Sequence, residues 1–142
     1  MSKHISRGGK DKNSGTLTKN QQKILDLLKE LDIEITAQDL HLQLRQQKSK
    51  IGLATVYRTL KTLHLQGIIQ ERITQTGESL YQLIDHHTHH LNCINCGKSE
   101  LIKEKHCIVD NHHHDRVAQK KFKLYYHTLE FYGLCECCQS QL

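Results

Sequence analysis

The sequence contains no hydrophobic run of the ~20 residues that a membrane-spanning helix requires, so a membrane protein is not expected. Its first residues, Met1 to His4, do not introduce the apolar core of a signal peptide, and we therefore expect a cytoplasmic protein. Because thiols stay reduced in that compartment, the six cysteines are not expected to form a disulfide framework. Metal or redox chemistry is favoured instead. Proline is also absent, and the sequence offers no physical reason for this.

The bulk composition sets wide bounds. A chain of 142 residues suffices for one ordinary domain or two small ones, and a hydrophobic content of 37% allows only modest cores. The formal net charge of +5 is compatible with nucleic-acid binding but does not establish it. Function must therefore be inferred from motifs.

Two Cys-x-x-Cys pairs, Cys93 with Cys96 and Cys135 with Cys138, form the strongest motif. Each pair can chelate one side of a zinc ion, and four thiolates complete a closed tetrahedral structural site. Such a site contributes on the order of 10 kcal/mol to the folded form. Cys137 is an alternative to Cys138, but the two-residue spacer favours Cys138.

Four histidines, His86, His87, His89 and His90, precede the first cysteine pair. Alternate side chains of a strand share one face, so His87 and His89 would form a chelating pair. Ligands from elsewhere must complete a nitrogen and oxygen site, and His127 and an acidic residue are available. The alternative interpretation is a solvated, histidine-rich linker.

The remaining candidate ligands are weaker. His112, His113 and His114 follow one another in an expected helix, where successive side chains point in different directions. Cys107 is interpreted as a small, buried apolar side chain. The sequence does not determine the roles of these residues or of Cys137.

The first half of the chain has the pattern of a helical domain. Residues 1–16 are basic and polar and are expected to be a flexible arm. Apolar residues at helical spacing predict helices beginning near Thr18, after the N-cap Thr36, and over residues 51–66. Residues 68–73 and 80–83 read as two strands of a hairpin around a turn at Thr76 and Gly77. Three helices followed by a hairpin predict a winged helix-turn-helix over residues 17–84.

The outer face of the third helix carries the candidate DNA contacts. Val56, Leu60 and Leu63 repeat at helical spacing and should face the core. The remaining surface is polar and basic, and it can enter a major groove through these side chains: Thr55, Tyr57, Arg58 and Lys61. An exposed helix face that binds nothing is the alternative.

Residues 85–142 are expected to form a second, metal-binding unit. Strands are predicted at residues 90–94, 100–102, 122–126 and 129–132, with a helix over residues 108–121. So short a sheet seldom stands alone, and we expect a second subunit to complete it. The fold class predicted is α+β: an N-terminal winged helix-turn-helix and a small C-terminal α/β dimerisation domain with structural zinc.

The stretch from Ile51 to Arg58, the wing, the histidine run and the two cysteine pairs together resemble the ferric and zinc uptake regulator family of bacterial metalloregulators. The similarity covers about residues 17–138. It implies a dimeric DNA-binding protein in which the four paired cysteines hold structural zinc. It also implies a regulatory metal site in the dimerisation domain, made of His87, His89, Asp110 and His127, with Asp110 where the family usually has a glutamate.

A second family site, which bridges the two domains, is altered. His90 matches it, but Thr88 and Gln82 stand where a histidine and an acid are usual, and Glu34 where a histidine often lies. The site is either lost or rebuilt, with this candidate set: Glu34, His86, His90 and Glu100.

The resemblance implies a metal-dependent transcriptional repressor that binds a palindromic, AT-rich operator as a homodimer. The regulatory metal would be zinc, iron or manganese, since nitrogen and oxygen ligands suit all three. The altered interdomain site favours zinc sensing, with an iron- or peroxide-responsive member of the family as the alternative.

A metal-buffering protein with a degenerate DNA-binding domain is the alternative of a different class. Asn20 and Gln21 replace the Pro-Arg usual in the first helix, whereas Tyr57 and Arg58 are retained and argue against this. An enzyme is not expected, because no nucleophile with a base and no paired carboxylates stand out.

Overall fold

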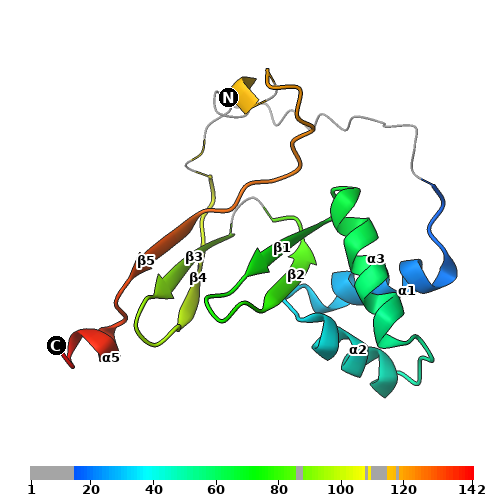
Figure 1. The fold of residues 1–142 in the computed structure, drawn as a ribbon, viewed down its shortest axis with the longest axis horizontal. Helices are drawn as coiled ribbons and strands as arrows, with labels where there is room; N and C mark the ends of the chain where they lie inside the picture. The colour runs from blue at the N-terminus through cyan, green and yellow to red at the C-terminus, as the bar shows by residue number, and fades with distance from the viewer. Residues whose placement is uncertain (1–14, 86–87, 108, 110–114, 118) are drawn as a thin grey trace.

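The computed structural model describes residues 15–85, 88–107, 109, 115–117 and 119–142, so most of the predicted N-terminal arm lies outside the described residues. Three helices come first, α1 (Lys19–Leu31), α2 (Ala37–Gln46) and α3 (Leu53–Leu65), followed by an antiparallel hairpin of β1 (Ile69–Ile73) and β2 (Ser79–Leu83). The strands β3 (Thr88–Cys93), β4 (Ser99–Lys103) and β5 (Glu130–Gly133) and the short helix α5 (Glu136–Gln139) form the second half. Figure 1 shows the helices at one end, the hairpin in the middle and the second sheet at the other end.

The helices begin where the sequence provides caps. The Thr18 hydroxyl accepts from the backbone N–H of Gln21, and the Gln21 side chain accepts in return from the backbone of Thr18, which is a complete capping box. Thr36 caps α2 in the same way, accepting from the backbone N–H of Asp39. Gln21, a departure from the family pattern, therefore has a structural use at the start of α1.

The core lies between the three helices and the first strand of the hairpin. Apolar side chains of all three helices are buried together with Ile69 of β1. Val56, Leu60 and Leu63 of α3 all belong to this core, as the helical spacing predicts. Burial of such side chains contributes about 1.5–3 kcal/mol each, which makes this cluster the main support of the first domain.

The second sheet has the order β4-β3-β5, with β4 antiparallel and β5 parallel to the central strand. The strand predicted at residues 129–132 is present as Glu130–Gly133. The strand predicted at residues 122–126 is wrong, because this segment has no strand pairing. Half of the helix predicted at residues 108–121 lies outside the described residues, and residues 115–117 within it are helical.

The segment predicted as a strand contacts the end of α3 instead. The Tyr125 hydroxyl donates to the carbonyl of Leu65 at 2.8 Å. The Tyr126 hydroxyl lies 2.7 Å from His64 Nε2 and accepts from the backbone N–H of Glu71 at 3.2 Å. Aromatic side chains favour strands in general, but here their hydroxyls find partners on the first domain, and these contacts fix the segment. His64 is therefore half-buried.

No helix in the described part of the chain is both long and apolar enough to cross a membrane.

Gly67 allows the close approach of Tyr125 to the end of α3. Its φ of +72° is a left-handed conformation, and an added Cβ would overlap the Tyr125 ring. Gly77 has a similar φ of +85°, but nothing lies within 4 Å of its Cβ position. An alanine at position 77 would therefore meet only the cost of a positive φ, whereas an alanine at position 67 would also overlap the Tyr125 ring.

Gly67→Ala should therefore destabilise the protein more than Gly77→Ala. Positive φ alone costs about 1–2 kcal/mol for alanine, and the Tyr125 overlap adds to this only at position 67. Urea unfolding of the zinc-loaded variants measures both costs. Equal losses would show that Tyr125 does not contact Gly67 in solution.

Candidate metal centres and nucleic-acid interface

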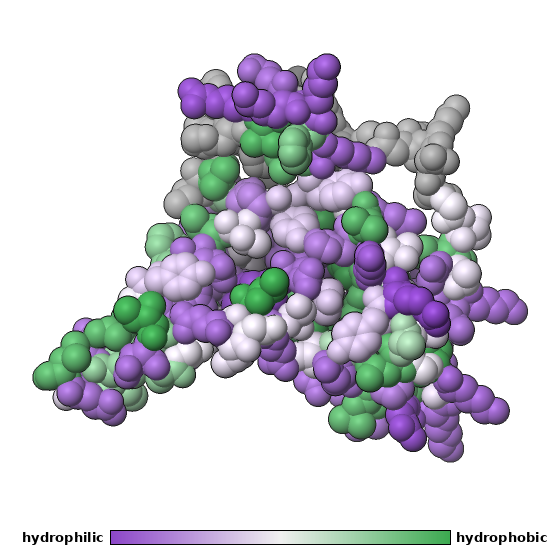
Figure 2. Space-filling model, in the orientation of Figure 1, coloured by the Kyte–Doolittle hydropathy of each residue, from purple (hydrophilic) through white to green (hydrophobic). Residues whose placement is uncertain are grey.

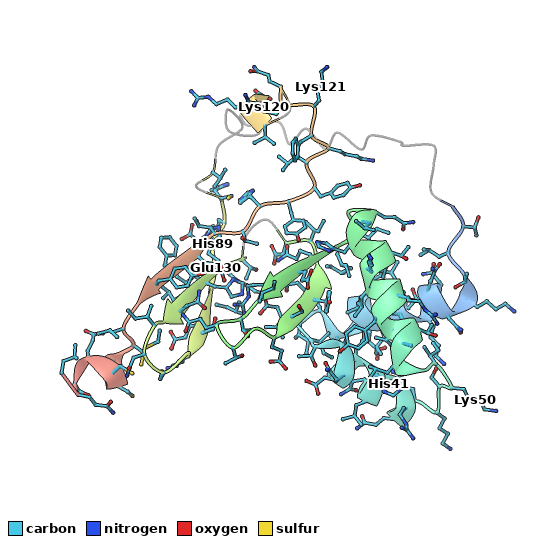
Figure 3. All side chains as sticks on the ribbon, in the orientation of Figure 1. His41, Lys50, His89, Lys120, Lys121 and Glu130 are labelled. Carbon is cyan, nitrogen blue, oxygen red and sulfur yellow. The ribbon has the colours of Figure 1, made fainter. Side chains whose placement is uncertain are left out.

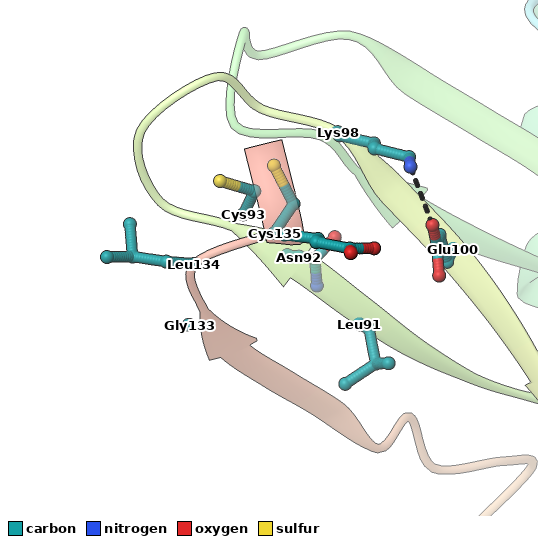
Figure 4. Close-up of a pocket in the computed structure, with 9 residues that line it drawn as sticks. Leu91, Asn92, Cys93, Lys98, Glu100, Gly133, Leu134 and Cys135 are labelled. Atoms are coloured by element: carbon teal, nitrogen blue, oxygen red, sulfur yellow. Dashed lines mark ion pairs between the residues drawn. The ribbon is translucent and has the colours of Figure 1, made fainter. Parts of the chain in front are cut away.

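The four predicted zinc ligands meet at one end of the second sheet. One sulfur atom from each of Cys93, Cys96, Cys135 and Cys138 lies within 4.8 Å of the other three. Cys93 ends β3, Cys96 follows in the tight turn before β4, Cys135 caps α5, and Cys138 lies within that helix. Figure 4 shows Cys93 and Cys135 on the wall of a hollow beside the exposed ion pair of Lys98 and Glu100.

The four thiols differ in how readily they lose their proton. The backbone N–H groups of Cys135, Cys96 and Asn95 lower the pKa of the Cys93 thiol to about 6, which favours the thiolate form that binds metals. The Asn95 side chain donates to Cys138 Sγ at 3.3 Å. The hydrogen bond from Asn95 acts on Cys138 in the same direction, but the neighbouring thiols and burial outweigh it and raise the pKa of Cys138 to about 12, so a metal must displace the proton there. Four sulfur donors held this close fit the tetrahedral site that zinc prefers. Cys137 is exposed and lies outside the cluster.

Cys96→Ser should remove one tightly held zinc ion per chain and lower the melting temperature, because three thiolates cannot close the site. Native mass spectrometry after mild chelation counts the retained zinc, and calorimetry gives the melting temperature. Cys137→Ser is the matched control and should retain the ion. If Cys137→Ser also loses zinc, the assignment of Cys138 as the fourth ligand is contradicted.

The opposite end of the same sheet gathers part of the predicted regulatory site. β3 begins there, β4 ends there and β5 begins there, so three segments meet. His89, 2% exposed, comes from β3, and His127 comes from the segment that enters β5. The structure also brings Cys107 to this point, with its Sγ 3.0 Å from His127 Nε2 and 3.9 Å from His89 Nε2. His87 and Asp110 lie outside the described residues.

Cys107 is a residue that the sequence analysis interpreted as apolar packing. The structure leaves it only half-buried and in contact with two imidazoles. The sequence did contain an indication of this role, because Cys107 lies three residues before the candidate ligand Asp110 and so places a thiol near the predicted site.

The second candidate site is not assembled as a metal site among the described residues. Glu34 and His90 meet, with 3.1 Å between Glu34 Oε1 and His90 Nε2, but Glu100 is exposed and pairs with Lys98 at 2.7 Å. His86 lies outside the described residues.

A buried arginine, Arg72, lies next to Glu34. Arg72 of β1 donates from Nε and Nη2 to the two Glu34 oxygens, each at 2.8 Å. Its Nη1 lies 3.4 Å from Glu130 Oε1 on β5, and the side chain is only 7% exposed. Figure 3 labels Glu130 and His89, which both lie over the second sheet, whereas His41 lies on α2 at the far end. The group of Glu34, Arg72, His90 and Glu130, here called the interdomain ion network, thus joins the two domains.

The electrostatics of this network favour its charged state. Burial alone would raise the pKa of Glu34, but hydrogen bonds from Arg72 and His90 and their positive charge outweigh this and lower it to about 2. Glu34 also raises the pKa of Arg72, so the guanidinium stays charged. The pairing of the Glu34 carboxylate therefore contributes fully to stability above about pH 4.5, the pKa of an unperturbed glutamate. This contribution is lost as the pH falls toward 2.

Arg72→Met should destabilise the protein by about 3–5 kcal/mol at neutral pH, because it leaves two part-buried carboxylates without their cation. Urea unfolding measures the loss. Lys98→Met, which breaks the exposed pair with Glu100, is the matched control and should cost far less, because water screens an exposed ion pair. Similar costs for the two variants would contradict the importance of the interdomain ion network.

The outer face of α3 has the composition predicted for a DNA contact. Tyr57, Arg58 and Lys61 are exposed, and Thr55 is half-buried. Arg58 Nη2 donates to the Thr55 hydroxyl at 3.3 Å, which holds the guanidinium along the helix. All four predicted contacts thus lie on the side of α3 away from its buried leucines.

Comparison with known proteins finds relatives that match most of this chain. Residues 12–132 match the ferric uptake regulator family. The zinc uptake regulation protein of Mycobacterium tuberculosis is 36% identical over 124 residues, which cover 87% of this chain and 94% of that protein.

Two solved structures extend the comparison. The Vibrio cholerae ferric uptake regulator, described for a rearrangement of its DNA-binding domains, has a TM-score of 0.59 and 30% identity, covering 84% of this chain and 92% of its own. A zinc uptake regulator in complex with zinc and DNA has a TM-score of 0.50 and 27% identity, covering 91% and 87%. These relatives are named for different metals, so similarity alone does not choose between zinc and iron.

Proposed function

This chain belongs to the ferric uptake regulator family, as the sequence resemblance predicted, and we propose that it is a zinc-responsive repressor of metal-uptake or metal-homeostasis genes. Its α+β fold is that of the family's metalloregulators. The observation that carries the proposal is the assembly in one chain of a basic, exposed α3 face and two candidate metal centres at the two ends of one sheet. Its activity is regulation, and we propose no catalytic reaction.

The α3 face supports recognition of double-stranded DNA. Arg58 and Lys61 present positive charge for phosphates or base edges, and Tyr57, 42% exposed, offers apolar contact to a thymine methyl group. A single α3 reads one half-site, so a homodimer on a palindromic, AT-rich operator is the proposed complex.

The free face of the second sheet supports the homodimer. Leu91 of β3 and Phe131 of β5 are cross-strand neighbours, so they share a face, and they remain 42% and 43% exposed. His90 and Glu130 occupy the other face and belong to the interdomain ion network. Figure 2 shows hydrophobic residues along the visible side of the arm formed by this sheet and α5. A second copy would cover the Leu91 and Phe131 face.

The preference for zinc rests on the interdomain ion network. Arg72 neutralises Glu34 within the first domain and reaches Glu130 of the second, while Glu34 contacts His90, so the protein's own charges do at this junction what a bridging ion would otherwise do. We therefore assign metal sensing to the site of His87, His89, Asp110 and His127, with zinc as its metal, and structural zinc to the four cysteines. An iron- or peroxide-responsive regulator is the second candidate, since the same nitrogen and oxygen ligands suit iron and manganese.

The proposed mechanism uses the direct connection between His127 and α3. His127 follows Tyr126, whose hydroxyl lies 2.7 Å from His64 in the last turn of α3 and accepts from the backbone of β1. His89 and His127 would hold the metal, which would join the two segments that carry them. His127, once held, fixes the position of Tyr126 and so favours the orientation of α3 that fits DNA, which shifts the population toward the binding-competent form.

The first experiment titrates chelator-treated protein with zinc and, without oxygen, with ferrous iron or manganese, while fluorescence anisotropy follows binding to a palindromic AT-rich duplex. Zinc should restore DNA binding at a free concentration about 100-fold lower than either other metal. His89→Ala should raise the zinc concentration required. Activation by iron or manganese instead would identify an iron- or peroxide-responsive regulator.

Arg58→Ala is the matched control for this titration, because it removes a proposed DNA contact and leaves the metal ligands intact. It should bind metal normally and lose DNA affinity at every metal concentration. DNA affinity that does not depend on metal would sink the regulatory proposal. Metal binding with no DNA affinity in the wild-type protein would favour the metal-buffering alternative.

A further inference from the structure

We propose that Cys107 is a thiolate ligand of the metal bound by His89 and His127, which makes the regulatory site a sulfur-containing one selective for zinc. This inference rests on the proposed regulatory site and names a ligand that neither the sequence pattern nor the family resemblance assigns to it. The argument begins from the position of the Cys107 sulfur.

The sulfur lies at a ligand distance from both imidazoles. With zinc bonds of about 2.3 Å to sulfur and 2.0–2.1 Å to nitrogen, a tetrahedral site separates these two donors by about 3.5 Å. Cys107 Sγ lies 3.0 Å from His127 Nε2 and 3.9 Å from His89 Nε2, values on either side of that separation. Among the described residues these three do not form a closed group of donors as the four cysteines do, so the two imidazoles must turn toward one another for one cation to contact all three atoms.

Hydrogen bonding by the thiol is the alternative to a metal. The thiol can donate its proton to one imidazole, and its sulfur can accept weakly from the N–H of the other. A metal ion would instead use one electron pair from each of the three atoms, and the spectroscopic test below distinguishes the two arrangements.

The second nitrogen of His89 faces a carboxylate without a hydrogen bond to it. His89 is 2% exposed, and its Nδ1 lies 3.8 Å from the Glu104 carboxylate, too far for a hydrogen bond. A carboxylate on this side favours the proton on Nδ1 and leaves the electron pair of Nε2 directed toward Cys107. Glu104 and Cys107 both lie just after β4, so one short segment supplies a ligand and the group that orients another.

The types of donor atom at this site favour zinc over manganese and ferrous iron. Two imidazoles and a thiolate suit zinc, whereas manganese prefers oxygen donors and ferrous iron binds more weakly in the divalent series. Removal of the sulfur should therefore weaken zinc binding at this site by about 10–100-fold and change manganese binding by less than about threefold.

Cobalt(II) spectroscopy tests the ligand directly. The full-length protein is first loaded with one zinc ion per chain at the four-cysteine site and then titrated with cobalt(II), with mass spectrometry confirming that the zinc is retained. The second metal should give a sulfur-to-cobalt charge-transfer band in the near ultraviolet. Cys107→Ser should abolish this band, and the matched control Cys137→Ser, an exposed cysteine outside both clusters, should keep it.

The outcomes separate this inference from the proposed function. Cobalt that binds without the band, or a band that persists in Cys107→Ser, overturns Cys107 as a ligand and leaves metal-dependent DNA binding untouched. Failure of the second cobalt ion to bind also overturns it. A band that depends on Cys107, in a protein whose DNA affinity ignores metal, supports the ligand and refutes the repressor.

Discussion

The interdomain ion network holds the two domains of this protein in one arrangement, because Glu34 contacts His90 and Arg72 contacts Glu130 across the junction. Arg72 comes from the hairpin of the winged helix, and the same guanidinium reaches Glu130 on the second sheet. Because these charges are largely withdrawn from water, they must stay paired, and the domains cannot separate without exposing them. The position of α3 relative to the candidate metal centres depends on this network.

The two ends of the second sheet carry two different sets of candidate metal ligands. The four-cysteine cluster lies where β3 ends, and its sulfur donors suit a permanent structural ion. His89, His127 and Cys107 lie where β3 begins, and the segments that carry His127 and Cys107 have no strand pairing. One end is thus suited to stability and the other to response, because only the latter lies beside residues that contact α3.

Tyr125 and Tyr126 form the physical connection between that responsive end and the DNA-binding domain. They follow the aromatic pattern of a strand, yet their hydroxyls bind Leu65 and His64 at the end of α3. Gly67 makes this possible, since a larger residue would meet the Tyr125 ring. The sequence analysis could not foresee this contact, because strand propensity is a local property and the partners lie about 60 residues away.

Local patterns alone were enough to predict the three helices, the wing, the four-cysteine cluster and the outer face of α3, because caps, helical spacing and ligand spacing are encoded within short stretches. The partners of Glu34, His90 and Cys107 were decided only by the tertiary structure. A charged or sulfur-bearing side chain takes its role from the groups that folding places within a few ångströms. For Glu34 that group is an arginine 38 residues away, and for Cys107 it is a pair of histidines from two other segments.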